Sequence, residues 1–441
     1  MQNIISGMIN TVKKVAFFTL GCKLNFAETS TISRYFINKG FEVVKFNEKA
    51  DFYVINTCSV TSNADKKSRN SISRALNTNP ESVIIVTGCY AQLKPDEIRK
   101  IYGVDYVFGA NNKDEIERII DNSSKLEQAN VISSEYKEMK KFFPAYSKGD
   151  RTRSFLKIQD GCDYFCTYCT IPYARGRSRN TEIKEIVRQA GIIVSEGIKE
   201  IIISGVNIGD FGKTTGESFF DLLRSLSKLD NIERYRIGSI EPNLLTDEII
   251  GFISSNPKFA PHFHIPLQSG CDEMLKLMNR KYDTSLFRHK IEKIKQLIPE
   301  AFIGIDLIVG VNGETDDYFN KTEEFVKSLD ISFIHHFQYS ERANTKALNF
   351  EPKIKPLQKQ NRSGIINEIS ELKHKKFLNE NINTIKNVLF ESTRKNNKMF
   401  GYTENYIKVG VDYNKDYINK ILKVRLGDFY NDDILHGKIE D

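Results

Sequence analysis

The sequence predicts an α/β protein in three parts: an N-terminal parallel sheet, a central partial (β/α)6 barrel and a small C-terminal antiparallel β-barrel. Apolar strand-like runs alternate with helical stretches twice along the chain, which is typical of parallel sheets covered by helices. The last segment instead shows short strands with period-two alternation and turn residues between them, as small antiparallel barrels do. A length of 441 residues allows two or three domains.

In the first third of the chain, strands and helices are expected in turn. The expected strands are Val15–Leu20, Asp51–Thr57, Ser82–Gly88 and Asp105–Gly109. The expected helices are Glu28–Asn38, Asp65–Leu76, Pro95–Lys100 and Lys113–Ile120. The polar, lysine-rich segment Asp121–Arg153 is expected to connect this part to the next.

A second alternating series follows. Its expected strands are Ser154–Gln159, Glu200–Gly205, Arg234–Ile240, His262–Leu267, Phe302–Gly310 and Phe333–Ser340. Helices are expected at Thr181–Ser195, Ser218–Leu229, Thr246–Ser254, Met274–Lys295 with a break, and Thr315–Leu329. Six β/α units predict an open, barrel-like sheet, in which polar residues at the strand C-termini converge on one face.

The C-terminal part begins with a basic helical connection at Lys355–Lys386. The barrel strands are expected at Lys386–Ser392, Tyr406–Asp412 and Lys420–Asp428. The predicted domains are residues 12–125, residues 148–350, a helical connection at 351–384, and a barrel at 385–441.

Composition and charge narrow the class of protein. Hydrophobic content is 40% and charged content 27%, as in globular proteins. No apolar run approaches the ~20 residues that span a bilayer, and the first residues lack the order of a secretion signal, so we expect a cytoplasmic protein without a membrane partner. A net charge of +7 favours a polyanionic partner. Residues 351–400 carry 11 Lys or Arg against 5 Asp or Glu, although a solvated basic helix would look the same.

Three of the seven cysteines, Cys162, Cys166 and Cys169, lie within eight positions, with no histidine nearby. In a reducing compartment such a group indicates a metal site rather than disulfides. A [4Fe–4S] cluster usually takes four cysteines, so three would leave one iron open for chemistry. The alternative is a zinc loop whose fourth ligand comes from a distant residue.

The spacing C-x3-C-x2-C, just after the first strand of a six-unit β/α series, resembles the radical SAM superfamily. The resemblance implies that S-adenosylmethionine (SAM) chelates the open iron and is cleaved to a 5′-deoxyadenosyl radical. It also implies SAM contacts at the later strand ends, in "SGVN", "SIEP", "PLQSG" and "GIDLIVGVNGET". The corresponding candidate SAM-binding residues are Ser204, Gly205, Asn207, Glu241, Gln268, Ser269, Asp306 and Gly310.

A second set of cysteines, Cys22, Cys58 and Cys89, is spread along the first third of the chain, but each follows an expected strand. In a parallel sheet such positions lie along the carboxyl edge, where open α/β folds bind ligands. Three thiolates there predict a second [4Fe–4S] cluster with a free iron. A lone cysteine after a strand is more often a small buried hydrophobe.

The segments "TLGCKLNFAET", "NTCSVT", "GCYAQ", "KIQDGCDYFCTYCTIPYARG" and "YSERANTKA" resemble the methylthiotransferases over essentially the whole chain. This family inserts sulfur into a C–H bond and methylates it. The last 60 or so residues look like the small RNA-binding TRAM barrel. The resemblance implies two [4Fe–4S] clusters, SAM, and an electron donor such as flavodoxin or ferredoxin; it indicates no particular sulfur donor.

Residues Lys23–Asn25 resemble the branch that acts on N6-threonylcarbamoyladenosine beside the tRNA anticodon. The isopentenyladenosine branch usually shows Gln-Met-Asn there, and the ribosomal-protein branch Pro-Lys-Asn. Leu24, Cys271 and Ala343-Asn344 depart from the usual pattern, but none of them removes a cluster ligand. We expect Cys271 to be a packed residue at a helix start.

An anticodon loop is read by base stacking and phosphate contacts. Candidates are the basic segment 351–400 and the barrel aromatics Phe400, Tyr402, Tyr406, Tyr413 and Tyr417. Arg175, Arg177 and Arg179 alternate, so in an extended chain they would share one side and contact RNA. The alternatives are the same chemistry on isopentenyladenosine or a ribosomal-protein side chain, and a non-catalytic iron–sulfur RNA-binding protein.

Overall fold

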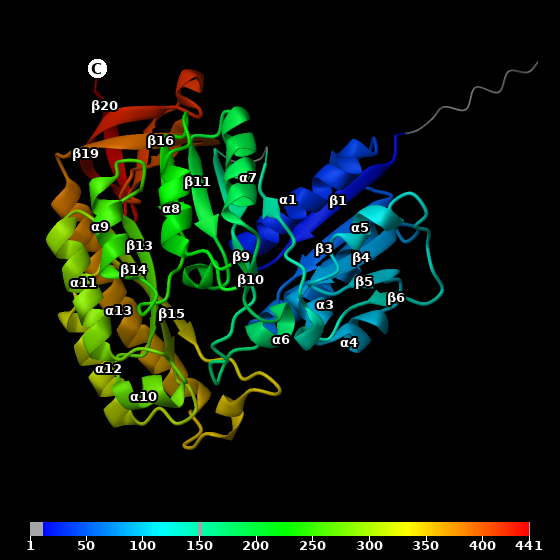
Figure 1. Ribbon diagram of the computed structural model, residues 1–441, viewed down its shortest axis with the longest axis horizontal. Coiled ribbons are helices and arrows are strands. Elements are labelled where there is room, and N and C mark those ends of the chain that lie inside the picture. Colours follow the sequence, from blue (N-terminus) through cyan, green and yellow to red (C-terminus); the bar gives the residue numbers. More distant parts are fainter. Residues whose placement is uncertain (1–11, 149–151, 441) are drawn as a thin grey trace, which may run out of the picture. The chain divides into compact units, whose positions relative to one another are not determined.

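The computed structural model describes residues 12–148 and 152–440, so residues 149–151 of the predicted connector lie outside it. The chain divides into two compact units, residues 1–139 and 140–441. Each unit is described by itself (Figure 1).

Unit 1 is built on a six-stranded parallel sheet in the order β2-β1-β3-β4-β5-β6. The strands are β1 (Lys14–Thr19), β2 (Glu42–Val44), β3 (Phe52–Thr57), β4 (Val83–Gly88), β5 (Tyr106–Phe108) and β6 (Asn130–Ile132). Both β3 and β4 are buried along their whole length, which is why their sequences are continuously apolar. The predicted parallel sheet is confirmed. The edge strands β2 and β6 were not predicted, because they are only partly buried and lack the continuous apolar run of the equally short β5.

Helices connect these strands. They are α1 (Lys23–Asn38), α2 (Ser62–Thr78), α3 (Cys89–Leu93), α4 (Pro95–Arg99) and α5 (Glu115–Ile119), and a 3-10 turn, η1, follows at Tyr136–Glu138. Helix α2 begins after Thr61, whose side chain accepts the backbone N–H of Ala64 and caps the helix. Helix α3 begins directly after β4, and α1 begins after a three-residue turn that follows β1, so the first turns of both helices lie at the carboxyl edge of the sheet.

Unit 2 contains six parallel β/α strands in two hydrogen-bonded groups, joined by a parallel bridge between Ser239 and His264. The strands are β8 (Arg153–Lys157), β11 (Glu200–Ser204), β12 (Arg234–Ile237), β13 (His262–Gln268), β14 (Phe302–Val309) and β15 (Phe333–Gln338). The short β7 (Ala145–Tyr146) pairs antiparallel with β8, and β9 (Gln159–Asp160) pairs with β10 (Arg179–Asn180). The predicted partial barrel is confirmed.

Helices cover the strands of the partial barrel, and the large hydrophobic core of unit 2 lies between these helices and strands (Figure 1). They are α6 (Ile171–Arg175), α7 (Ile183–Ser195), α8 (Phe219–Ser227), α9 (Asp247–Ser255), α10 (Asp272–Leu277), α11 (Thr284–Leu297), α12 (Asp316–Ser328) and α13 (Pro356–Asn381), with 3-10 turns η2 (Ile208–Asp210) and η3 (Lys346–Asn349). The predicted break between Met274 and Lys295 is confirmed: it separates α10 from α11.

The C-terminal segment forms a closed five-stranded barrel in the order β16-β17-β18-β20-β19. Its elements are β16 (Ile385–Lys395), β17 (Lys398–Tyr402), β18 (Lys408–Asp412), η4 (Lys415–Tyr417), β19 (Ile421–Asn431) and β20 (Ile434–Ile439). The expectation of a purely antiparallel barrel is wrong at one seam, because β18 and β20 pair in parallel to close it. Only three of these strands were predicted.

A buried group of ion pairs joins the C-terminal barrel to the amino ends of strands β11 and β12 in the partial barrel. Glu200 pairs with Arg236 at 2.9 Å and Arg234 at 3.2 Å. The two guanidinium groups also donate to barrel carbonyls, Arg234 to Asn387 at 2.9 Å and Arg236 to Thr403 at 3.2 Å. Burial alone would raise the pKa of Glu200, but the arginines outweigh it and lower the pKa to about 2. The carboxylate therefore stays charged and fixes both arginines toward the barrel.

Candidate active site

The three-cysteine loop lies between β9 and α6, just beyond the carboxyl end of β8. Gly161 opens it with a φ of +71°, and a Cβ there would lie 2.0 Å from the Arg177 carbonyl oxygen, so only glycine fits. The backbone N–H of Cys162 donates to the Gly176 carbonyl at 3.1 Å and closes the loop. The backbone therefore reverses direction tightly in this loop, which allows several of its sulfurs to point inward.

The sulfur environment suits metal ligands. Backbone N–H groups of Tyr164 and Ile171 lie 3.5 and 3.4 Å from the sulfurs of Cys162 and Cys169. Burial raises the pKa of the Cys162 thiol to about 12 and also raises the pKa of Cys169. Thiols with raised pKa values stay protonated by themselves, and they would ionise as cluster ligands only beside the positive charge of bound iron. Among residues 12–148 and 152–440, no three His, Cys, Asp or Glu side chains converge on the position of a single metal ion; a cubane cluster is larger than one ion.

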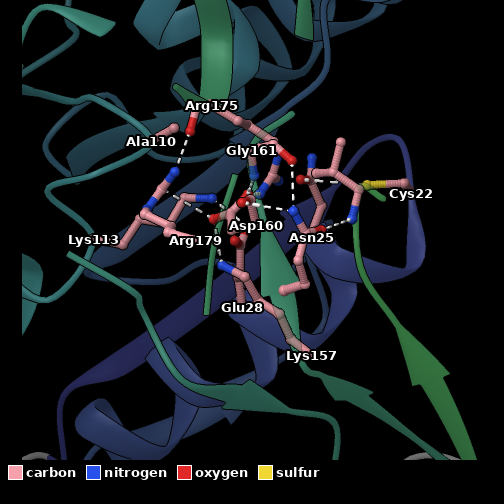
Figure 2. A network of polar contacts seen from close by, with 12 residues as sticks. Cys22, Asn25, Glu28, Ala110, Lys113, Lys157, Asp160, Gly161, Arg175 and Arg179 are labelled. Atoms are coloured by element: carbon pink, nitrogen blue, oxygen red, sulfur yellow. Dashed lines mark hydrogen bonds and ion pairs between the residues drawn. The ribbon is translucent and has the colours of Figure 1, made fainter. Parts of the chain in front are cut away.

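A buried cationic group supports the base of the loop (Figure 2). Asp160 contacts Lys157 at 2.7 Å, Arg175 at 2.9 Å and Arg179 at 3.3 Å. Burial alone would raise the pKa of Asp160, but these cations hold the pKa well below its usual value. Arg175 and Arg179 are 1% and 4% exposed, so the expectation of three arginines on one accessible side is corrected. Of the three, only Arg177 presents its side chain to solvent, at 62% exposure.

The end of β11 carries the first group of predicted SAM contacts. Gly205 is packed so closely that a Cβ would lie 2.7 Å from Ile208 and 3.1 Å from the Gln159 side chain. Gln159 accepts the backbone N–H groups of Val206 and Asn207 at 3.0 and 2.8 Å, which ties this turn to the cysteine loop. Both polar atoms of the Asn207 amide are buried and make no well-formed hydrogen bond in the described chain, although Tyr164 and Asp210 lie close by. A polar ligand such as SAM would satisfy them.

Two further predicted contacts carry charge at strand ends or inside the barrel. Glu241, beyond β12, pairs with Arg280, and burial raises the pKa of its carboxyl group although Arg280 lowers it. Asp306, on β14, lies 2.8 Å from the His264 ring on β13, and both side chains are about one-fifth exposed. Each acid therefore has a charged or hydrogen-bonding partner within the partial barrel.

The remaining predicted contacts make structural interactions. Ser204 is buried and bonds the Ile202 carbonyl at 3.3 Å. Ser269 lies 3.2 Å from Thr322 on α12. Gln268 has a φ of +67°, at an irregularity in the pairing of β13. At Gly310 (φ +75°) a Cβ would lie 2.4 Å from Lys359 of α13.

Sequence reasoning missed the residues that hold the cysteine loop. Gln159 donates to the Gly161 carbonyl at 2.8 Å as well as joining β11. Asn243, whose side-chain oxygen is buried without a partner in the described residues, donates to the Tyr164 hydroxyl at 2.8 Å. Asn279 and Arg280 reach the loop from the α10–α11 break. The one signal in the sequence was the expected break within the helical stretch Met274–Lys295.

The second cysteine set lies at the carboxyl ends of three adjacent parallel strands, β1, β3 and β4, as predicted. Cys22 precedes α1, Cys58 follows Thr57 directly, and Cys89 opens α3. Cys22 is exposed, whereas Cys58 and Cys89 are 7% and 4% exposed. The three thiols thus share one edge of one sheet.

Local packing fixes these strand ends to one another. The Asn25 side chain donates to the carbonyls of Leu20 and Thr57 at 2.7 and 3.0 Å, joining the chain before Cys22 to the chain before Cys58. The Thr57 hydroxyl donates to the Thr87 carbonyl at 2.6 Å, which extends the link toward Cys89. Gly21 and Gly88 have φ of +97° and +101°, and a Cβ on Gly21 would lie 3.0 Å from the Cys58 sulfur. The edge is preorganised around the cysteines.

The tripeptide after Cys22 divides into buried and accessible residues. Leu24 and Asn25 are 4% and 1% exposed, whereas Lys23 is half-buried. A turn further along α1, Glu28 forms a fully buried ion pair with Lys113 (Figure 2). Asn25 is thus a positioning residue, and Lys23 is the most accessible member of the tripeptide.

The predicted RNA-contacting barrel carries cations on its outer face. Lys423 and Arg425 alternate on β19, and Arg425 pairs in register with Lys438 of β20. Arg425 is also paired with Glu440 at 2.7 Å, which leaves Lys423 and Lys438 as the exposed lysines of these two strands. Cys271, by contrast, is 1% exposed at the start of α10 and packs with Met274, Met278 and Val311, as expected.

Within the described residues, no helix combines the length and the apolar character that crossing a membrane requires.

Comparison with known proteins agrees with this architecture. Residues 14–109 match the model of uncharacterized protein family UPF0004, and residues 156–326 match the radical SAM superfamily. The threonylcarbamoyladenosine tRNA methylthiotransferase MtaB of Bacillus subtilis is 39% identical over 97% of both chains. MtaB of Aquifex aeolicus is 37% identical over 93% of this chain and 99% of its own. A tRNA-2-methylthio-N(6)-dimethylallyladenosine synthase of Alkaliphilus oremlandii is 34% identical over 94% and 90%.

Among solved structures, the radical SAM methyltransferase TsrM of Kitasatospora setae superposes with a TM-score of 0.54 at 12% identity. The match covers 74% of this chain and 72% of TsrM, and it supports the fold alone. With the near-full-length relatives, the family is settled: the chain belongs to the radical SAM methylthiotransferases, enzymes that depend on SAM and [4Fe–4S] clusters.

Proposed function

We propose that this enzyme inserts sulfur and a methyl group at C2 of N6-threonylcarbamoyladenosine at tRNA position 37, giving the 2-methylthio nucleoside. The observation that carries the proposal is the near-full-length similarity to curated relatives of that name, at 36–39% identity. The relatives named for dimethylallyladenosine are 33–34% identical. Isopentenyladenosine and a ribosomal-protein side chain are the alternative substrates of the same chemistry.

The proposed ligands of the SAM-binding cluster are Cys162, Cys166 and Cys169, and those of the second cluster are Cys22, Cys58 and Cys89. When bound, the first cluster would support reductive cleavage of SAM, and the second would hold sulfur from an external donor for delivery to the substrate. The buried Asn207 amide, which makes no well-formed hydrogen bond in the described chain, supports SAM binding beside the cysteine loop. Glu241, Asp306 and the turn at Ser204–Gly205 are proposed to orient SAM, while Gln268, Ser269 and Gly310 shape the strand ends behind it.

Lys23 supports the choice of substrate branch. Its half-buried side chain follows the exposed Cys22 directly, and the two residues after it are buried. The threonylcarbamoyl group carries a carboxylate, which a lysine ammonium can pair with, whereas the dimethylallyl group is neutral. We assign to Lys23 the contact with that carboxylate.

The proposed RNA contacts are Arg177 beside the cysteine loop and the cations on β19 and β20. The anticodon loop of tRNA is the proposed partner, and a one-electron donor such as flavodoxin or ferredoxin is the proposed source of reducing equivalents. We propose a cytoplasmic location, where tRNA and such a donor are found. A non-catalytic RNA-binding role would require no SAM chemistry.

Mass spectrometry of tRNA nucleosides tests the proposal. A strain lacking the gene is expected to lose 2-methylthio-N6-threonylcarbamoyladenosine and to keep the unmethylthiolated form. Complementation with the wild-type gene should restore it. Loss of the dimethylallyl derivative instead would move the substrate to the alternative branch. Reduced enzyme given SAM alone is expected to release 5′-deoxyadenosine, and its failure to do so would favour the binding protein.

A further inference from the structure

The segment between α10 and α11 is hydrogen-bonded to the cysteine loop, although more than a hundred residues separate the two in sequence. The backbone N–H of Thr167 donates to the Met278 carbonyl at 3.1 Å, and its hydroxyl donates to the Leu277 carbonyl at 3.1 Å. The Asn279 amide donates to the Tyr164 and Phe165 carbonyls at 3.0 and 3.2 Å. The loop is held by its backbone, between its cysteines.

Arg280, in the same segment, brings a positive charge close to the cysteine loop. Its guanidinium, 3% exposed, lies 3.2 Å from the Cys166 sulfur and 3.4 Å from the Tyr168 hydroxyl. The same guanidinium is fixed by an ion pair with Glu241 and by the Tyr282 hydroxyl, which its Nε reaches at 3.1 Å. It is therefore held in place and aimed at one of the three sulfurs.

We propose that Arg280 is a positioning residue that raises the reduction potential of the cluster on the cysteine loop, and that Glu241 moderates this effect. The inference rests on the proposed ligand role of Cys162, Cys166 and Cys169. Reduction adds one electron, supplied by the external donor, and no bond forms or breaks. A buried cation that donates to a ligand sulfur stabilises the added negative charge, whereas a neighbouring carboxylate opposes it.

A redox titration followed by electron paramagnetic resonance tests this assignment. It uses the full chain, reconstituted without SAM, in a background with Cys22, Cys58 and Cys89 changed to alanine. Iron content then reports on the ligand assignment by itself: about four irons per chain are expected, the content of one [4Fe–4S] cluster. About eight irons, or none, would overturn the ligand assignment whatever Arg280 does.

Arg280→Gln keeps a hydrogen-bond donor but removes the charge. This variant is expected to lower the equilibrium constant for reduction of the cluster at least tenfold. For a one-electron couple, that corresponds to a reduction potential lower by about 59 mV. Glu241→Gln is expected to shift the potential in the opposite direction, and Arg280→Lys, which keeps the charge, to stay nearer the wild-type value. The matched control is Arg224→Gln, because Arg224 is an arginine 58% exposed on α8 and its charge is screened.

Opposite shifts in Arg280→Gln and Glu241→Gln, with the control unmoved, support the proposal. Shifts of the same sign, or no shift in either variant, overturn it, because a purely structural role would loosen the loop in both. If Arg280→Gln fails to retain iron, the sign of the Glu241→Gln shift decides, and a downward or absent shift overturns the assignment.

Discussion

At the scale of single residues, the two cysteine sets are expected to do different work. Cys162→Ala is expected to abolish cleavage of SAM to 5′-deoxyadenosine, since Cys162 is one of the three cysteines of the loop beside the proposed SAM turn. Cys58→Ala is expected to leave part of that cleavage and to stop sulfur insertion. The two products are measured in the same reaction by chromatography. Equal loss of radical formation in both variants, with folding preserved, would contradict a division of labour.

Arg177 is the arginine of the cysteine loop that remains available to RNA. Its guanidinium stacks on Phe165, 4.7 Å from the ring centroid, and is 62% exposed. Arg177→Ala is expected to weaken tRNA binding and to make its salt dependence shallower by about 0.7 in the logarithmic slope, as for one single-strand phosphate contact. The measurement is a binding titration at several salt concentrations. Arg188→Ala is the matched control, because Arg188 is also 62% exposed, on α7; equal effects of both would refute the contact.

The fate of the other two arginines shows what a local pattern leaves out. Alternation in R-x-R-x-R predicted a shared exposed side, but Arg175 closes a short helix and Arg179 starts a strand. Both arginines pair with Asp160, which lies on β9 just before the cysteines and is buried in the folded chain. Spacing along the chain carries no information about a carboxylate that only the fold brings close.

At the scale of elements, the Glu200 group on β11 and β12 makes stability depend on pH. The folded pKa of Glu200 is about 2, below its ordinary value of 4.5. The ionised Glu200 carboxylate therefore stabilises the folded state fully at pH values above its pKa in the unfolded chain. This stabilisation is lost as pH falls from about 4.5 toward about 2. The shift corresponds to about 3 kcal/mol at neutral pH.

Glu200→Gln is accordingly expected to lower the free energy of unfolding by about 3 kcal/mol at pH 7, because it strands the buried guanidinium groups. The difference from wild type should shrink as pH falls below about 4.5. Urea unfolding at several pH values measures it. Glu248→Gln, an exposed acid on α9, is the control and should leave stability unchanged at every pH. A difference for Glu200→Gln that persists undiminished at low pH would exclude the ionised carboxylate as its source.

The elements that sequence reasoning found are those whose burial is complete. Strands such as β3 and β4 are buried on both faces, so their apolar runs were unmistakable and their ends were placed within a residue or two. Strand β20 was missed because Gly437 and the exposed His436 break its alternation. Short α3 was missed because its helical turn comes from the position of Cys89 after a strand, not from periodicity.

At the scale of the whole molecule, sequence predicted the order of the parts but not how the C-terminal barrel is attached. The attachment includes side chain-to-carbonyl bonds from Arg234 and Arg236 to the backbone of the C-terminal barrel. It also includes an ion pair between Arg153 and Glu391 at 2.8 Å and ring contacts of Tyr406 with Phe302. These partners lie far apart in the sequence, so no local pattern reveals them. The consequence is geometric. The barrel meets the amino ends of the core strands, whereas the proposed SAM site lies at their carboxyl ends, about 17 Å away along a five-residue strand.

A barrel attached at that end is expected to bind tRNA without taking part in the chemistry. Reversing two cations on its outer face, Lys423→Glu with Lys438→Glu, should therefore weaken tRNA binding at least tenfold and reduce its salt dependence. SAM cleavage in the absence of tRNA should keep its wild-type rate, because neither residue approaches the cysteine loop. The control pair is Lys228→Glu with Lys276→Glu, exposed lysines at α8 and on α10 that change the net charge equally. If the control weakened binding as much, only overall charge would matter; if the barrel pair slowed SAM cleavage, the barrel would be coupled to the reacting end of the core.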